Sequence, residues 1–223
     1  MFFAPILFFY AIIFFIVLFV WFFFVWIGVI RGVFETLGLS PHLAFMALLA
    51  SLIGSYINIP IARVSSRIPP PAQIVSTFGV RYPIPIRYAS SETVIAINVG
   101  GAIVPVLISI YVLGHLPAII PNAMIGIGIV AFIVNRFARP VPGLGIATPM
   151  IVPPIVAALC GWLLGANHPD AVAYTSGVIG TLLGADIFNL NKISGLGAPV
   201  ASIGGAGTFD GIFLTGIVAV LLA

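Results

Sequence analysis

The chain has 223 residues, of which 61% are hydrophobic and only 6% charged, and its formal net charge is +3. Its mean hydropathy is +1.28, whereas a soluble domain carries roughly a quarter charged residues. This composition excludes a soluble globular fold, and the eight basic residues are too scattered to form a nucleic-acid-binding patch. The single cysteine, Cys160, excludes an intrachain disulfide.

Long apolar runs separated by charges, prolines and glycines predict about seven membrane-spanning helices, because a span needs about 20 apolar residues. The first run would form ~43 Å of helix at 1.5 Å per residue, which is longer than the hydrocarbon core. We expect residues 1–31 to form this long N-terminal helix and residues 32–223 to form a helix bundle. The predicted fold is therefore an all-α, polytopic transmembrane bundle in the cell membrane, with spans near 2–30, 43–62, 93–113, 118–134, 150–166, 171–189 and 204–223.

The segment 63–92 is the only sizeable polar stretch between these spans. Its three consecutive prolines, Pro69, Pro70 and Pro71, forbid helix. The alternating pattern through 80–88 predicts extended or hairpin structure. We expect this loop to be ordered at one mouth of the bundle, since it is too apolar for a free tail.

The positions of the basic residues predict which side of the membrane each loop faces, because Lys and Arg are retained on the cytoplasmic side. With seven spans, Arg31 alone falls on one side of the membrane. The N-terminus is therefore predicted to be cytoplasmic, together with loops 63–92, 135–149 and 190–203. Those loops hold the remaining basic residues, Arg63, Arg67, Arg81, Arg87, Arg136, Arg139 and Lys192.

Two acidic residues fall within predicted spans, Asp186 in LLGADIFNL and Asp210 in GGAGTFDGIFLTG. An ionisable residue inside a membrane is a functional hypothesis by default. Antiparallel packing of the last two spans would bring both residues to a similar depth. Two neighbouring carboxylates share one proton, so that one can activate a water while the other protonates a carbonyl. We therefore predict Asp186 and Asp210 as the catalytic pair of an intramembrane hydrolase.

Four other residues complete the predicted site. Asn98 is a candidate hydrogen-bond donor to a carboxylate, because the neighbouring glycines allow its span to approach closely. Asn189 is a second polar candidate near Asp186, and Gly205 and Gly207 would permit close backbone approach before Asp210. We expect Asn98, Asn189, Gly205 and Gly207 to contribute to substrate or ion binding.

Two other functions remain open. The same carboxylates with asparagine oxygens would suit a cation or proton site in a channel or transporter. Alternatively, Asp210 caps a helix and Asp186 makes a packing hydrogen bond in a non-catalytic scaffold. The asparagines concerned are Asn58, Asn98, Asn122 and Asn189.

The histidines His42, His115 and His168 lack the close spacing of a metal site. We therefore predict neither a metal nor another cofactor. The expected partners are the lipid bilayer and a membrane-protein or peptide substrate, with homo-oligomerisation left open and nucleic acid excluded.

Several stretches carry a resemblance to known families: SLIGSYINIPI, AINVGGAIVP, ARPVPGLGIATP, GTLLGADIFNL and GLGAPVASIGGAGTFDGIFLTGI. They resemble a prokaryotic family of uncharacterised membrane proteins, the domain-of-unknown-function family 1614, over roughly residues 45–223. This resemblance implies a shared membrane fold and no particular activity.

A weaker resemblance is to the presenilin and signal-peptide-peptidase class of intramembrane aspartyl proteases. These enzymes carry catalytic aspartates on consecutive helices, the second in a Gly-x-Gly-Asp motif. In this chain Gly205, Ala206 and Gly207 are separated from Asp210 by two residues. The resemblance implies catalytic roles for Asp186 and Asp210.

Overall fold

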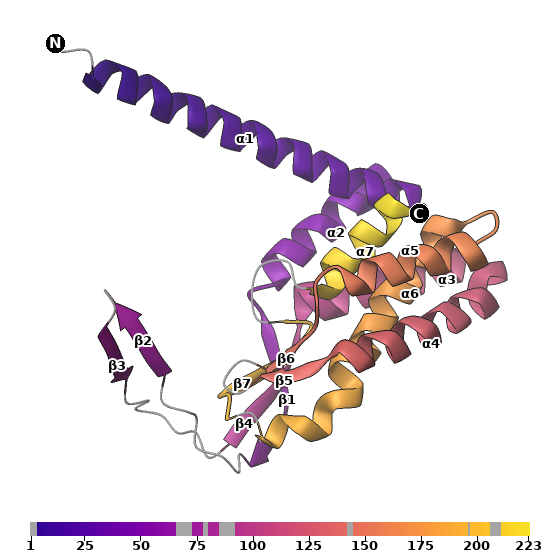
Figure 1. Cartoon of the computed structure of the whole chain (residues 1–223). Coiled ribbons are helices and arrows are strands. Elements are labelled where there is room, and N and C mark those ends of the chain that lie inside the picture. The colour runs from indigo at the N-terminus through magenta and orange to yellow at the C-terminus, as the bar shows by residue number, and fades with distance from the viewer. Residues whose placement is uncertain are drawn as a thin grey trace. The chain divides into compact units, whose positions relative to one another are not determined.

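The computed structural model describes residues 4–65, 73–77, 80–84, 92–141, 145–195, 197–205 and 211–223. Helices dominate these residues, with short strands between them (Figure 1). The chain divides into two compact units, Met1–Leu48 and Leu49–Ala223.

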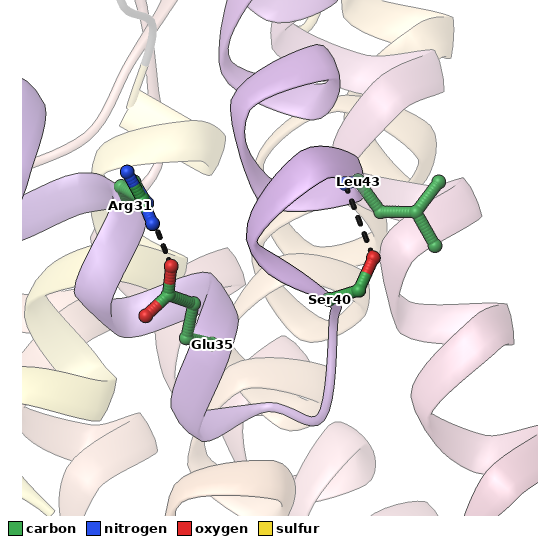
Figure 2. Close-up of polar contacts among 4 residues, drawn as sticks. All are labelled: Arg31, Glu35, Ser40 and Leu43. Carbon is green, nitrogen blue, oxygen red and sulfur yellow. Dashed lines mark hydrogen bonds and ion pairs between the residues drawn. The ribbon is translucent and has the colours of Figure 1, made fainter.

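The first unit contains the long helix α1, Ala4–Thr36, of 33 residues. A helix of this length rises about 50 Å, against ~30 Å of hydrocarbon. The predicted division into residues 1–31 and 32–223 stays a prediction. Arg31 Nε lies 2.6 Å from Glu35 Oε1, one turn later (Figure 2). This pair balances the charges at the end of an otherwise uncharged helix.

Helix α2, Pro41–Gly54, follows a short turn. The residues at its N-terminus are typical of a helix start. Ser40 Oγ accepts a hydrogen bond from the Leu43 N–H at 3.4 Å (Figure 2), and proline suits the first helical position. The helix ends at Gly54.

Three strands form one sheet in the second unit, in the order β1-β4-β7. β1 pairs antiparallel with β4, with Asn58 opposite Asn98, and β4 pairs parallel with β7, with Val94 opposite Val200. The described part of the chain is mostly helical, as predicted, but these strands mean that the fold is not purely α-helical. The strands are β1 (Asn58–Ser65), β4 (Glu92–Asn98) and β7 (Val200–Ile203).

These strands also interrupt two predicted spans. The span 43–62 leaves helix at Gly54, and 93–113 begins as strand β4 before its helical part. In the described part of the span 204–223, the helix is the twelve-residue α7, Gly211–Leu222. The physical reason in β4 is its run of β-branched residues, which favour a strand, while a short apolar run alone does not distinguish strand from helix.

The remaining elements follow in chain order. The predicted hairpin is confirmed within the described part of 63–92, where Gln73–Thr77 pairs with Val80–Ile84. The other elements are the π-helical turn η1 (Val99–Ile103), α3 (Val104–His115), η2 (Pro117–Ile119), α4 (Ile120–Phe137), β5 (Arg139–Val141), β6 (Gly145–Ala147), α5 (Val152–Leu164), α6 (Pro169–Thr181), the π-helical turn η3 (Leu182–Asp186) and the 3-10 helix η4 (Ile187–Gly195).

Helix α6 is the centre of the second unit and packs against α3, α4, α5 and α7. Almost all of its residues are buried. Glycines permit this close packing: a Cβ on Gly180 would lie 2.6 Å from Val130 Cβ, and one on Gly184 would lie 2.5 Å from Ala131 O, both in α4. The tight contact holds the C-terminal end of α6 beside α4.

Within the described ranges, three helical segments are long and apolar enough to cross a membrane: Ile12–Thr36, Pro117–Phe137 and Pro169–Ser194. The molecule is thus a membrane protein, whereas the count of seven spans and the cytoplasmic N-terminus remain predictions. The shorter apolar helices are Pro41–Gly54, Val99–His115, Val152–Leu164 and Gly211–Leu222.

Parts of the three loops that were predicted to share one side lie together, because β1 contacts η4, and β6 contacts both η3 and η4. The basic residues of these contacting segments and of the adjoining end of α4 are Arg63, Arg136, Arg139 and Lys192.

Candidate functional site

Asp186 lies where the regular helix α6 ends. The last turn, η3, is π-helical, and the N–H of Ile187 donates to Leu182 O, five residues back. The following residues wind as the tighter 3-10 helix η4. Such changes of helix type leave carbonyls without their usual partners, and π-helical turns are frequent at functional sites.

The side chain of Asn189 bonds to backbone carbonyls at this change of helix type. Its Nδ2 donates to Gly184 O and to Ala185 O, both at 2.9 Å, while its Oδ1 accepts from Lys192 Nζ at 2.6 Å. Asn135 Nδ2 of α4 adds a donor to Gly184 O at 3.1 Å. The fully buried Asn189 therefore uses its polar atoms to hold the backbone around Asp186.

Asp186 is also joined to the segment that follows β7. The N–H of Gly204 donates to Asp186 Oδ2 at 3.2 Å. Gly204 and Gly205 have φ angles of 81° and 88°, which favour glycine. A Cβ on Gly204 would lie 2.5 Å from the Cβ of Ala102. The carboxylate thus lies beside a junction of η3, η1 and the end of the sheet.

Asn98 shapes the η1 side of this junction and is fully buried. Its Nδ2 donates to Ser55 O at 2.7 Å and to Asn58 Oδ1 at 3.2 Å. Its Oδ1 accepts the Gly101 N–H at 2.7 Å. Both amide hydrogens are therefore directed at groups other than a carboxylate, and Asn98 fixes the turn between β4 and α3.

Ser202 connects this network to the end of β7. Its hydroxyl lies 2.6 Å from Asn58 Oδ1 and also within hydrogen-bonding reach of Gly205 O. The structure thereby brings Asp186, Gly205 and Asn98 into one region, with Asn189 on the other side of the helix break. Asp210 and Gly207 lie outside the described residues, so the distance between the two predicted catalytic residues stays untested.

Three residues of this region were not among those predicted from the sequence: Ser202, Gly204 as a donor to Asp186, and Thr181. Thr181 precedes Asp186 by five residues, and α-helical periodicity places residues three or four apart on one face. The π turn changes that spacing, so the sequence pattern carried no signal for Thr181.

The three histidines, which were not predicted to bind a metal, are not among the residues that make the contacts described above. His115 Nδ1 lies 2.9 Å from Tyr111 O in the last turn of α3, and both His42 and His168 are exposed. Within the ranges that the structure describes, no three His, Cys, Asp or Glu residues come close enough to hold a metal ion.

Comparison with known proteins gives one match. The family described as "Protein of unknown function (DUF1614)" matches residues 52–222, which include every element around Asp186. Neither the curated proteins nor the solved structures contain a match. The resemblance to presenilin-type proteases gains no support from these comparisons. The chain belongs to the family described as protein of unknown function DUF1614.

Proposed function

We propose that this protein is an intramembrane hydrolase that cleaves peptide bonds with Asp186 and Asp210. The observation that carries the proposal is the hydrogen bond from Gly204 N–H to Asp186 Oδ2. It ties the carboxylate at the end of α6 to the segment that leads, through residues 206–210, to α7. A second carboxylate on that segment would serve as the chemical partner of Asp186.

The reaction requires one ionised and one protonated carboxyl group, which two close carboxylates provide. The ionised group takes a proton from water, and the water oxygen bonds to the carbonyl carbon. The protonated group transfers its proton to the carbonyl oxygen. The C–N bond then breaks as the first group gives its proton to the amine nitrogen and the second takes a proton back from a hydroxyl of the gem-diol, which restores both carboxyl groups.

A peptide is the substrate class that suits this region. Among the described strands, β7 forms one edge of its sheet and ends directly before Gly204. An extended peptide that paired with this edge would pass beside Asp186, and strand addition is a common mode of peptide recognition.

Cation binding is less well supported, because the proposed asparagine ligands are already hydrogen-bonded. Asn98 Oδ1 accepts the Gly101 N–H, and Asn189 Oδ1 accepts from the positively charged Lys192. Asn122 Nδ2 donates to Leu164 O, near the ends of α4 and α5 that lie away from the sheet. These asparagines do not present free oxygens around Asp186.

The test uses purified protein in lipid vesicles with a mixture of apolar membrane-segment peptides, and mass spectrometry detects the cleavage products. Asp186→Asn and Asp210→Asn should each reduce cleavage at least about a hundredfold, the usual range for an acid–base group, and both variants should remain folded. Asp170→Asn is the matched control, since Asp170 lies in the first turn of α6, at its opposite end. Unchanged cleavage by Asp186→Asn would refute the proposal.

A channel or transporter is the second candidate. The observation that favours it is the meeting of the π-helical turns η1 and η3 with Gly204, beside one carboxylate, as in transporters with broken helices. Ion flux into vesicles that Asp186→Asn abolishes, in the absence of any peptide cleavage, would favour this function over hydrolysis.

A further inference from the structure

Helices α6 and α7 pack side by side in opposite directions. Trp162 Nε1 at the end of α5 donates to Ala223 O at 2.7 Å. A Cβ on the neighbouring Gly161 would lie 2.8 Å from the Cβ of Ala173, in the first half of α6. Ala223, which follows α7, therefore lies beside the start of α6. The first residues of α7 lie beside the end of α6.

One face of α6 is directed toward α7. A Cβ on Gly177 would lie 3.2 Å from Thr215 Cγ2, and a Cβ on Gly216 would lie 2.8 Å from Val178 Cγ2. Thr181 follows Gly177 by four residues and Val178 by three, so it belongs to the same face. Because the helices are antiparallel, Thr181 lies level with the first turn of α7, which starts at Gly211.

Among the residues that the structure describes, the buried hydroxyl of Thr181 has no hydrogen-bond partner, and the residue is only 3% exposed. Two nearby buried hydroxyls of α6 bond within their own helix: Thr175 donates to Ala171 O at 2.7 Å, and Ser176 donates to Val172 O at 2.5 Å. A buried hydroxyl without a partner is unfavourable, so Thr181 points to a ligand.

The π turn brings Asp186 to the same face as Thr181. In η3 the hydrogen bonds join residues five apart, as between Ile187 N and Leu182 O. The residue that follows Thr181 on the same face of the helix is therefore Asp186, five positions later, and not Ala185. The first N–H groups of α7 lack partners within their own helix and favour an electron-rich atom. By these helical spacings Thr181 and Asp186 share one face, and Thr181 lies level with the start of α7.

We propose that Thr181 and Asp186 together bind a water molecule at the start of α7. A buried water needs two to four polar partners, and this position offers a hydroxyl, a carboxylate and the N-terminus of a helix. In the proposed hydrolase, on which this role rests, Thr181 is the residue that positions the attacking water. The water site itself does not depend on catalysis.

A double-mutant cycle tests the shared water without an activity assay. Thr181→Val removes the hydroxyl at nearly constant volume, and it should lower the thermal unfolding temperature because the bound water loses a partner. Once Asp186→Asn has altered the other partner, Thr181→Val should have a different effect, so the two changes should not add. Thr175→Val is the control and should combine additively with Asp186→Asn, because its hydroxyl bonds within the helix.

Two outcomes overturn the inference. A higher unfolding temperature for Thr181→Val would mean that the hydroxyl is simply buried and dry, and additive effects of Thr181→Val and Asp186→Asn would mean that no ligand is shared. Activity separates this inference from the proposed function. If Asp186→Asn abolishes peptide cleavage while Thr181→Val shows the wild-type pH profile, only the role of Thr181 fails. If coupling is present without any peptide cleavage, only the hydrolase fails.

Discussion

The close contact between α2 and η1 predicts a large effect of one added methyl group at Gly100. A Cβ on this residue would lie 1.9 Å from Ser51 O, 2.4 Å from Ser55 N and 2.8 Å from the carbonyl carbon of Gly54. All three are backbone atoms, so Gly100→Ala must push α2 away from η1. The movement also stretches the hydrogen bond of 2.7 Å between Ser51 Oγ and Gly100 O.

The expected magnitude follows from these contacts. Overpacking a tight site costs about 1–3 kcal/mol, and loss of the Ser51 hydrogen bond adds ~1 kcal/mol. Reduced freedom of the unfolded chain returns about 0.4–1 kcal/mol. Gly100→Ala should therefore lower the free energy of unfolding by about 1–3.6 kcal/mol, or the unfolding temperature by about 2–14 °C at 2–4 °C per kcal/mol.

Gly128 provides the matched control, since it is an exposed helical glycine of α4 with no atom within 4 Å of an added Cβ. Gly128→Ala should stabilise the helix by roughly 0.5–1 kcal/mol. The assay is thermal unfolding in detergent, followed by Trp162 fluorescence after Trp21 and Trp26 are replaced by Phe. If Gly100→Ala and Gly128→Ala unfold at the same temperature, the close approach of α2 and η1 is refuted.

Two further predictions concern the polar network and the topology. Asn98→Ala leaves Ser55 O and the Gly101 N–H without their buried partner, so it should lower the free energy of unfolding by about 2–4 kcal/mol; denaturant titration measures this, and a change within ±0.5 kcal/mol would contradict the network. Cysteines introduced at Ser76 and Asn167 should react with impermeant reagents from opposite sides of the membrane, and labelling of Ser76 from outside intact cells would contradict the predicted orientation.

Composition and hydrophobic patterning alone determined that this chain is a membrane protein, because a chain with 6% charged residues cannot cover its surface with polar groups. The same pattern predicted the long first helix and the hairpin within 63–92, since both depend on local signals. The position of Asp186 in a predicted span identified the carboxylate around which the polar junction lies. These features need no knowledge of distant contacts.

Only the tertiary structure decided where the spans break. Residues 93–98 are apolar enough for a helix, yet they form β4 because β1 and β7 supply hydrogen-bonding partners from distant parts of the chain. The partners of Asn98 and Asn189 are mostly backbone groups, which sequence pattern does not reveal. The π turn η3 also changes the helical spacing between Thr181 and Asp186, which the sequence pattern does not reveal. Such features depend on which backbone groups meet after folding, and residue types alone do not specify this.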